Sequence, residues 1–176
     1  MKQLFLALFF LLACGPAFSQ AQKINWMSLE EAFAKTQQEP RKILIDVYTD
    51  WCGWCKVMDQ KTFSDPKVVN YVNKNYYAVK FNAESRKDVK IGDKVYKFDS
   101  ANRAHEAAIA LLQGNMSYPS IVYLDEKFNM IQPVPGYMEA KPFHQVITFI
   151  GGDHHRKEQF EAFKTGTYVK TYSSGK

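Results

Sequence analysis

Two of the three cysteines of the chain are separated by two residues in the motif Trp51-Cys52-Gly53-Trp54-Cys55. The motif directly follows a mostly apolar run, residues 43–48, which is typical of a buried strand. A strand that leads into a Cys-x-x-Cys pair at the first turn of a helix places the first sulfur beside unpaired backbone N–H groups. The helix dipole favours a thiolate at that position. Because the thiolate is the nucleophile of disulfide exchange, the motif indicates redox chemistry. On spacing alone, half of a zinc site or a small structural staple would also fit.

Neither alternative is favoured by the rest of the chain. A disulfide that closes so small a loop stabilises little, because the entropic gain grows with loop length. A zinc site needs further ligands, and the sequence offers no second Cys-x-x-Cys or His-x₃₋₅-His partner. His105, at the start of a predicted helix, is expected to cap or pack. We therefore expect a reactive Cys52–Cys55 disulfide, no metal and no other cofactor. A Gly-x-Gly-x-x-Gly or flavin fingerprint is also absent from the sequence.

Disulfide exchange also needs a proton acceptor. Cys52, at the helix start, is expected to be the exposed nucleophile, and Cys55, one turn further in, the buried resolving thiol. Asp46 lies among apolar residues of the predicted strand, and burial there would raise its pKa, because desolvation disfavours the charged form. Lys80 on the next strand would pair with Asp46 and tune it. An exposed strand acid and an ordinary surface lysine are the alternatives.

The elements that must position these residues alternate between strands and helices. A helix opens at Ser28, where Glu31 completes a capping box, and ends before Pro40. The remaining predicted elements are strand 42–48, helix 52–62, a helix from Pro66, strand 76–81, a polar insertion 85–99, helix 101–113, strands 120–124 and 130–134, helix 141–150 and an extra helix 153–164. This order predicts an α/β fold with a central mixed β-sheet flanked by helices.

With these elements in place, the chain resembles the thioredoxin superfamily. The resemblance is carried, in order, by Ile43-Leu44-Ile45-Asp46, Trp51-Cys52-Gly53-x-Cys55-Lys56, Lys80-Phe81-Asn82, Tyr118-Pro119-Ser120 and Gly136. It covers residues 42–150 and is strongest toward secreted thioredoxin-like proteins related to the C-terminal domain of the bacterial transmembrane disulfide reductase. The resemblance implies a thioredoxin-like fold and supports catalytic roles for Cys52, Cys55, Asp46 and Lys80.

The same resemblance implies a groove for polypeptide substrates. Its expected residues are Trp51, Gly53, Trp54, Tyr118, Pro119 and Gly136. The bond before Pro119 is expected to be cis, which leaves the Tyr118 backbone free to pair with an extended substrate peptide. Trp51 and Trp54 would form an apolar docking surface, with core packing as the alternative. Trp54 stands where cytoplasmic thioredoxin has proline, so the direction of electron flow stays open.

The ends of the chain indicate export. Residues 1–19 have the charge, apolar stretch and small-x-small site of a cleaved signal peptide. Cys14 also fits a bacterial lipoprotein box, so a lipid anchor through Cys14 is the alternative. Residues 20–164 are then predicted to form one thioredoxin-like domain, and residues 165–176 a frayed tail. The formal net charge of +5 is scattered along the sequence rather than clustered, which argues against nucleic-acid binding.

We therefore predict a periplasmic or otherwise extracytoplasmic protein disulfide reductase that serves cell redox homeostasis. Its expected partners are proteins with disulfides or thiols and a membrane-bound electron donor, and the chain is expected to be a monomer. Two alternatives remain open. One is an oxidase or isomerase that runs the same exchange in the other direction, and the other is a peptide-binding or chaperone module without turnover.

Overall fold

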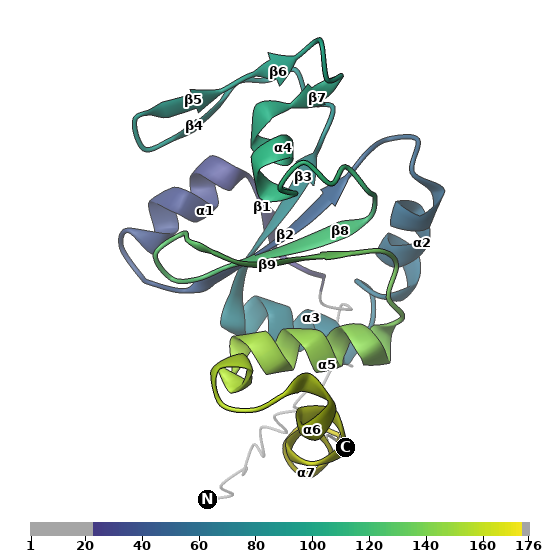
Figure 1. Cartoon of the computed structure of the whole chain (residues 1–176). Coiled ribbons are helices and arrows are strands. Elements are labelled where there is room, and N and C mark those ends of the chain that lie inside the picture. Colours follow the sequence, from purple (N-terminus) through teal and green to yellow (C-terminus); the bar gives the residue numbers. More distant parts are fainter. Residues whose placement is uncertain (1–22, 174–176) are drawn as a thin grey trace, which may run out of the picture.

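A computed structural model describes residues 23–173 and contains a five-stranded sheet in the order β1-β3-β2-β8-β9 (Figure 1). The strands are β1 (Trp26–Met27), β2 (Lys42–Tyr48), β3 (Tyr76–Asn82), β8 (Ser120–Leu124) and β9 (Met130–Pro135). β1, β3 and β2 run parallel, whereas β8 is antiparallel to both β2 and β9. The predicted α/β class with a mixed sheet is confirmed. The short β1 was not predicted from the sequence.

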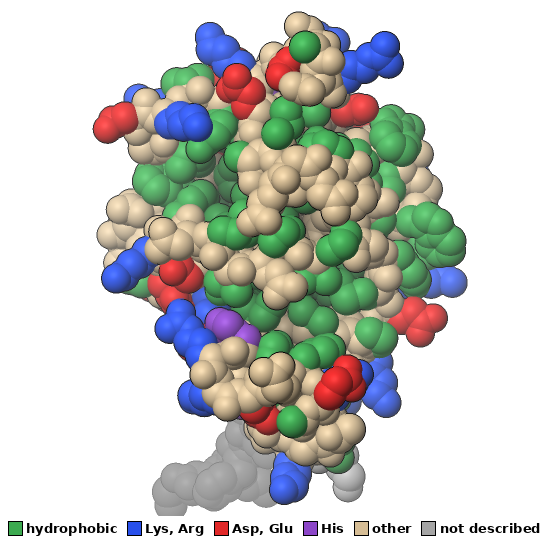
Figure 2. All heavy atoms as spheres, in the orientation of Figure 1, with side chains coloured by type: hydrophobic (Ala, Val, Ile, Leu, Met, Phe, Trp, Pro, Cys, Tyr) green, Lys and Arg blue, Asp and Glu red, His purple; other side chains and the backbone are tan. Residues whose placement is uncertain are grey.

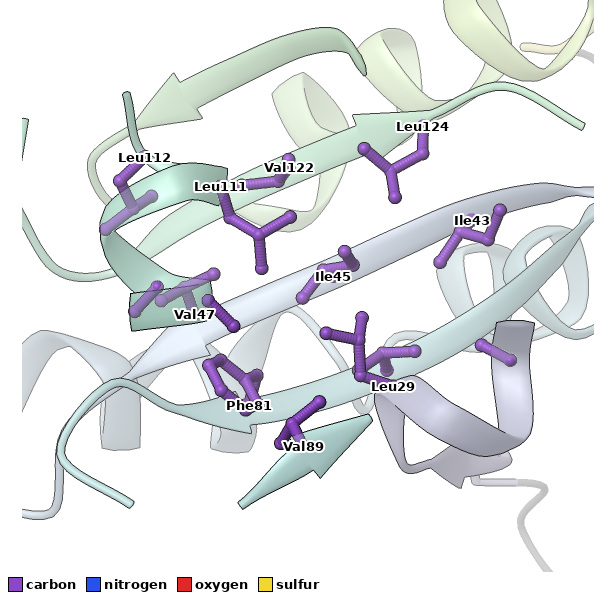
Figure 3. Packing of buried hydrophobic residues seen from close by; sticks show 14 of the residues in the cluster. Leu29, Ile43, Ile45, Val47, Phe81, Val89, Leu111, Leu112, Val122 and Leu124 are labelled. Atoms are coloured by element: carbon purple, nitrogen blue, oxygen red, sulfur yellow. The ribbon is translucent and has the colours of Figure 1, made fainter. Parts of the chain in front are cut away.

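Helices cover both faces of the sheet. α1 (Leu29–Thr36) and α4 (Glu106–Leu111) pack on one face, and α3 (Pro66–Asn75) and α5 (Ala140–Gly151) pack on the other with α2 (Gly53–Lys61) (Figure 1). The side chains of β2 alternate between the two cores. Ile43 and Ile45 point into the core under α1 and α4 (Figure 3), while Leu44 belongs to the core on the side of α2, α3 and α5. Because side chains alternate along a strand, Asp46 lies on the same face as Leu44, the face that α2 covers.

Local sequence signals explain where the helices begin. Ser28 and Glu31 form the predicted capping box of α1. Asp65 caps α3 through the backbone N–H groups of Lys67 and Val68, and Pro66 occupies the first position of that helix.

The polar insertion is built from two short hairpins. They are formed by β4 (Val89–Ile91) with β5 (Lys94–Tyr96), and by β6 (Phe98–Asp99) with β7 (Ala104–His105). The predicted helix 101–113 is therefore wrong at its start, because α4 begins only at Glu106. The Asp99 carboxylate accepts from two backbone N–H groups of the following turn, and Arg103 has a positive φ of 52°. Both features interrupt helical geometry before His105 caps α4.

The C-terminal region also differs from the prediction. Instead of one helix over 153–164, the chain forms a 3₁₀ turn (η1, His154–Arg156), α6 (Phe160–Thr165) and α7 (Thr167–Thr171). Asp153 adopts a positive φ of 57° and forms an ion pair with Lys42 at 3.0 Å, so the chain turns there. The expected tail from Thr165 continues as α7, whose Tyr168 is buried and contacts His144 of α5.

The predicted signal peptide and Cys14 lie outside the described residues. None of the helices formed by residues 23–173 has the length and hydropathy of a membrane span.

Candidate redox site

The two cysteines of the motif are joined by a disulfide at the start of α2. Cys52 is the N-cap residue, and its Sγ accepts a hydrogen bond of 3.1 Å from the backbone N–H of Cys55. A sulfur in this position is stabilised as a thiolate by the free N–H groups and the dipole of the helix. Only 4% of the surface of either residue is exposed. The expected contrast between an exposed Cys52 and a buried Cys55 is therefore absent in this disulfide form, because the Cys52 sulfur is turned onto the first turn of α2.

Asp46 is buried on the sheet face that α2 covers, as predicted, with 1% of its surface exposed. Burial raises the pKa of Asp46 to about 6, although the positive charge of Lys80 acts in the opposite direction. One carboxylate oxygen, Oδ1, has no hydrogen-bond partner among the described residues. Asp46 is therefore a carboxyl that can exchange a proton near neutral pH.

Lys80 pairs with Asp46, also as predicted. The two residues are register partners on β2 and β3, and Lys80 Nζ lies 2.9 Å from Asp46 Oδ2. Lys80 Nζ also forms an ion pair with Asp59 of α2. Burial alone would lower the pKa of Lys80, but the two carboxylates outweigh it and the pKa is raised. Lys80 thus stays charged between two acids.

Asp59 was missed by the sequence reasoning. It lies four residues after Cys55 on α2, so the two side chains share one face of the helix. That spacing, next to a predicted strand lysine, was the available signal. Through Lys80, Asp59 links the cysteine-bearing helix to Asp46 of the central strand.

Trp51 and Trp54 are both exposed, at 66% and 61% of their surface. Core packing is therefore wrong for both residues. The Trp51 ring contacts Tyr118 edge-to-face at 5.9 Å between centroids, and Trp51 Nε1 donates to Glu84 Oε1 at 3.0 Å. Hydrophobic side chains protrude at the edge of the molecule where α2 lies (Figure 2).

On the other side of the motif, Trp54 lies 5.2 Å from the ring of Tyr137. Tyr137 follows Gly136, whose backbone N–H donates to the carbonyl oxygen of Pro119 at 2.8 Å. The Tyr118–Pro119 peptide bond is cis, as the resemblance implied, and Gly136 has a positive φ of 96°. The structure thus joins the predicted substrate residues into one surface around the disulfide. Sequence reasoning missed Glu84, which lies four residues after Lys80, and Tyr137, which directly follows Gly136.

Gly53 is the remaining predicted site residue. It is exposed at the first position of α2, and a Cβ added to it would meet no atom within 4 Å. Space around the site therefore does not require glycine there. Across the described part of the chain, no group of three or more His, Cys, Asp or Glu side chains is placed to hold a metal ion.

The sequence is similar to one family model and to several known proteins. The family model described as Thioredox_DsbH, protein of unknown function DUF255, matches residues 17–150. The thiol:disulfide interchange protein DsbD of Pectobacterium atrosepticum is 30% identical over 129 residues, which is 72% of this chain and 19% of that protein. Spermatogenesis-associated protein 20 of Rattus norvegicus is 34% identical over 67 residues, 38% of this chain and 8% of that protein. The chain thus spans a fifth or less of the length of these relatives.

Solved structures show the same fold at low sequence identity. A DsbH oxidoreductase superposes with a TM-score of 0.54 at 15% identity, covering 77% of this chain and 93% of the other. A thioredoxin-fold protein from Helicobacter pylori gives a TM-score of 0.56 at 18% identity, covering 80% and 96%. Together with the family match over most of the sequence, these likenesses show that the chain has the thioredoxin fold and belongs to the Thioredox_DsbH family.

Proposed function

We propose that this protein is a thiol-disulfide oxidoreductase of the cell envelope that reduces protein disulfides. The observation that carries the proposal is the placement of the Cys52–Cys55 pair at the N-terminus of α2. The same helix is tied to the buried Asp46 through Asp59 and Lys80. A structural staple would need neither the helix N-terminus nor a buried acid with a raised pKa.

The reaction starts from the dithiol form. The Cys52 thiolate attacks one sulfur of a substrate disulfide, forms a mixed disulfide and releases the first substrate thiolate. The Cys55 thiolate then attacks Cys52 Sγ, releases the second substrate thiolate and closes the disulfide seen in the structure. Two electrons and two protons pass to the substrate, and the oxidised protein must be reduced again before the next cycle.

Asp46 is the group that we assign to the proton of Cys55. A carboxyl with a pKa of about 6 is largely ionised near neutral pH, yet basic enough to accept a proton from a thiol transiently. Asp46→Asn is therefore expected to slow release of the mixed disulfide while leaving its formation by Cys52 intact. Quenched-flow mass spectrometry with a peptide disulfide would resolve the two steps.

The surface around the disulfide favours polypeptide substrates. Trp51 and Trp54 expose their rings on both sides of the sulfurs, and each ring packs against a tyrosine. Aromatic rings that are apolar yet carry a polar handle are typical of protein-binding surfaces. The proposed location outside the cytoplasm rests on the signal-like residues 1–19. A membrane-bound electron donor would supply the reducing equivalents there.

Insulin reduction tests the proposal. The protein without residues 1–19 is expected to precipitate insulin chains in the presence of dithiothreitol, whereas Cys52→Ser should be inactive. Equal rates for the two proteins would overturn the proposal. In a parallel test, Cys55→Ala should accumulate mixed disulfides with substrate proteins through Cys52. A binding module without turnover would accumulate none.

The direction of electron flow is tested separately by equilibrium with glutathione. We expect a potential near the reducing value of thioredoxin, about −270 mV. A value toward about −120 mV, which is that of a strong disulfide oxidant, would reverse the proposed direction while leaving the chemistry of the pair unchanged.

A further inference from the structure

A hollow of about 490 Å³ lies next to the redox motif, and its lining residues are Glu84, Arg86, Phe98, Ser100 and Arg103. All of them belong to the chain between β3 and β7, which forms the inserted hairpins above α4 (Figure 1). The hollow is connected to the motif by a direct contact, because Glu84 accepts the hydrogen bond from Trp51 Nε1. Trp51 is the residue before Cys52, so the hollow adjoins the exposed tryptophan that flanks the disulfide.

The hollow presents two arginines. The Arg86 guanidinium lies 4.4 Å from the centroid of the Phe98 ring, which holds this side chain against the wall. Within residues 23–173, neither Arg86 nor Arg103 forms a salt bridge or a side-chain hydrogen bond, whereas Arg41 and Arg156 both pair with acids. Among the described residues that line the hollow, Glu84 is the one acid, and it accepts from Trp51 without pairing with either arginine. The guanidinium groups are therefore available to a ligand.

We propose that Arg86 and Arg103 form a specificity site for an acidic side chain that lies close in sequence to the reacting cysteine of a polypeptide substrate. The inference rests on the proposed function and adds a substrate preference to it. Planar guanidinium groups bind carboxylates through paired N–H donors.

The surroundings favour a polypeptide over a small free anion. The exposed rings of Trp51 and Trp54 and the contact with Tyr137 continue the surface on the far side of the sulfurs. A small anion would account for the arginines but would leave this apolar surface without a role. An extended polypeptide that crosses the disulfide would contact both the arginines and the apolar surface.

The test compares three symmetric disulfides, each made from a short peptide with one cysteine. The peptides are identical except that two residues beside the cysteine are Asp, Asn or Lys. Reduced protein is mixed with each peptide, and the rate constant for its oxidation is measured by acid quench and mass spectrometry. We expect the Asp peptide to react about tenfold faster than the Asn peptide and the Lys peptide more slowly than both, because two exposed charge pairs contribute modestly. The advantage should shrink as salt screens the charges.

The variant Arg86→Gln/Arg103→Gln is expected to react with all three peptides at the rate that the parent shows for the Asn peptide. Lys90→Gln is the control, because Lys90 is exposed on β4 of the same insertion but does not line the hollow. It should keep the preference for Asp. Circular dichroism and thermal unfolding establish that each variant is folded.

The results of this experiment distinguish failure of the arginine specificity site from failure of the proposed oxidoreductase function. Equal rates for the three peptides with the parent protein, or an Asp preference that survives in the double variant, would overturn the specificity site while leaving the oxidoreductase proposal intact. No exchange with any peptide would overturn the proposed function itself.

Discussion

At the scale of single residues, Asp46 makes the stability of this protein depend on pH. Its carboxyl binds a proton more tightly in the folded protein, where the pKa is about 6, than in the unfolded chain, where the ordinary value is 3.8. The favourable contribution of the protonated carboxyl is therefore complete below about pH 4 and is lost as the pH rises through 6.

The oxidised protein provides the test. The free energy of unfolding of Asp46→Asn, relative to the parent, is expected to increase by about 2 kcal/mol between pH 4 and pH 8, because the variant no longer holds a buried charge. Urea unfolding at a series of pH values measures this difference. If the difference in free energy of unfolding between the variant and the parent stays constant from pH 4 to pH 8, the raised pKa of Asp46 is contradicted.

Two neighbours should move the pKa of Asp46 in opposite directions. Lys80→Met removes the positive charge that lowers this pKa, so titration should shift above pH 6. Asp59→Asn removes a negative charge that raises it, so titration should shift below pH 6. The ¹³C chemical shift of the Asp46 carboxyl measures both shifts directly, without an assay of activity. Glu161→Gln, an exposed acid on α6, is the control and should leave the titration unchanged. Shifts of the same sign in the two test variants would refute the assigned electrostatic roles.

At the scale of elements, His105 joins the insertion to the sheet domain. It is completely buried, its Nδ1 accepts from the Ala107 N–H as the cap of α4, and its Nε2 lies 3.1 Å from the Lys87 carbonyl oxygen. His105→Ala should cost about 2 to 3 kcal/mol, since it removes a helix cap, leaves a cavity at a completely buried position and takes away the donor to the Lys87 carbonyl. Asparagine at this position can restore the cap of α4, but its side chain is too short to reach the Lys87 carbonyl. His105→Asn should therefore lose less stability than His105→Ala. Denaturant unfolding of the three proteins gives the comparison, and equal losses would show that the cap contributes nothing.

The strands that carry the site could be predicted because each depends on a local pattern. The apolar runs at 42–48 and 120–124 match β2 and β8 residue for residue, and the pairing of Asp46 with Lys80 follows from their positions on neighbouring strands. The ion pair of Asp59 and the hydrogen bond between Trp51 and Glu84 could not be predicted in the same way. Both depend on how a helix and an insertion are placed over the end of the sheet, which short-range patterns do not encode. The same limit explains the misplaced start of α4, where hairpin pairing overrides helix propensity.

At the scale of the whole molecule, the C-terminal segment, residues 153–173, packs against the rest of the domain. Phe163 is completely buried, and its ring lies 4.7 Å from His154 and 5.1 Å from Phe149. Lys42 at the start of β2 pairs with both Glu126 and Asp153, which fastens the turn after α5 to the sheet. Because a fully buried ring and the ion pairs of Lys42 join the segment to α5 and the sheet, we expect the segment to unfold together with the sheet in one transition.

Phe163→Ala tests this expectation. Removing a buried aromatic ring leaves a cavity, so the free energy of unfolding should fall by about 3 to 5 kcal/mol. Val169→Ala on the exposed side of α7 is the matched control, because 51% of Val169 is accessible and its truncation should change stability by less than about 0.5 kcal/mol. Fluorescence and circular dichroism should report the same midpoint for each variant if the segment and the sheet unfold together. Under folding conditions, Phe163→Ala should still react with the peptide disulfides at the parent rate, because the ring of Phe163 packs against Phe149 of α5 and His154 of η1 and not against the motif. An early, separate transition for the C-terminal segment would instead make it an independent appendage, and its aromatic cluster would then contribute nothing to the stability of the redox domain.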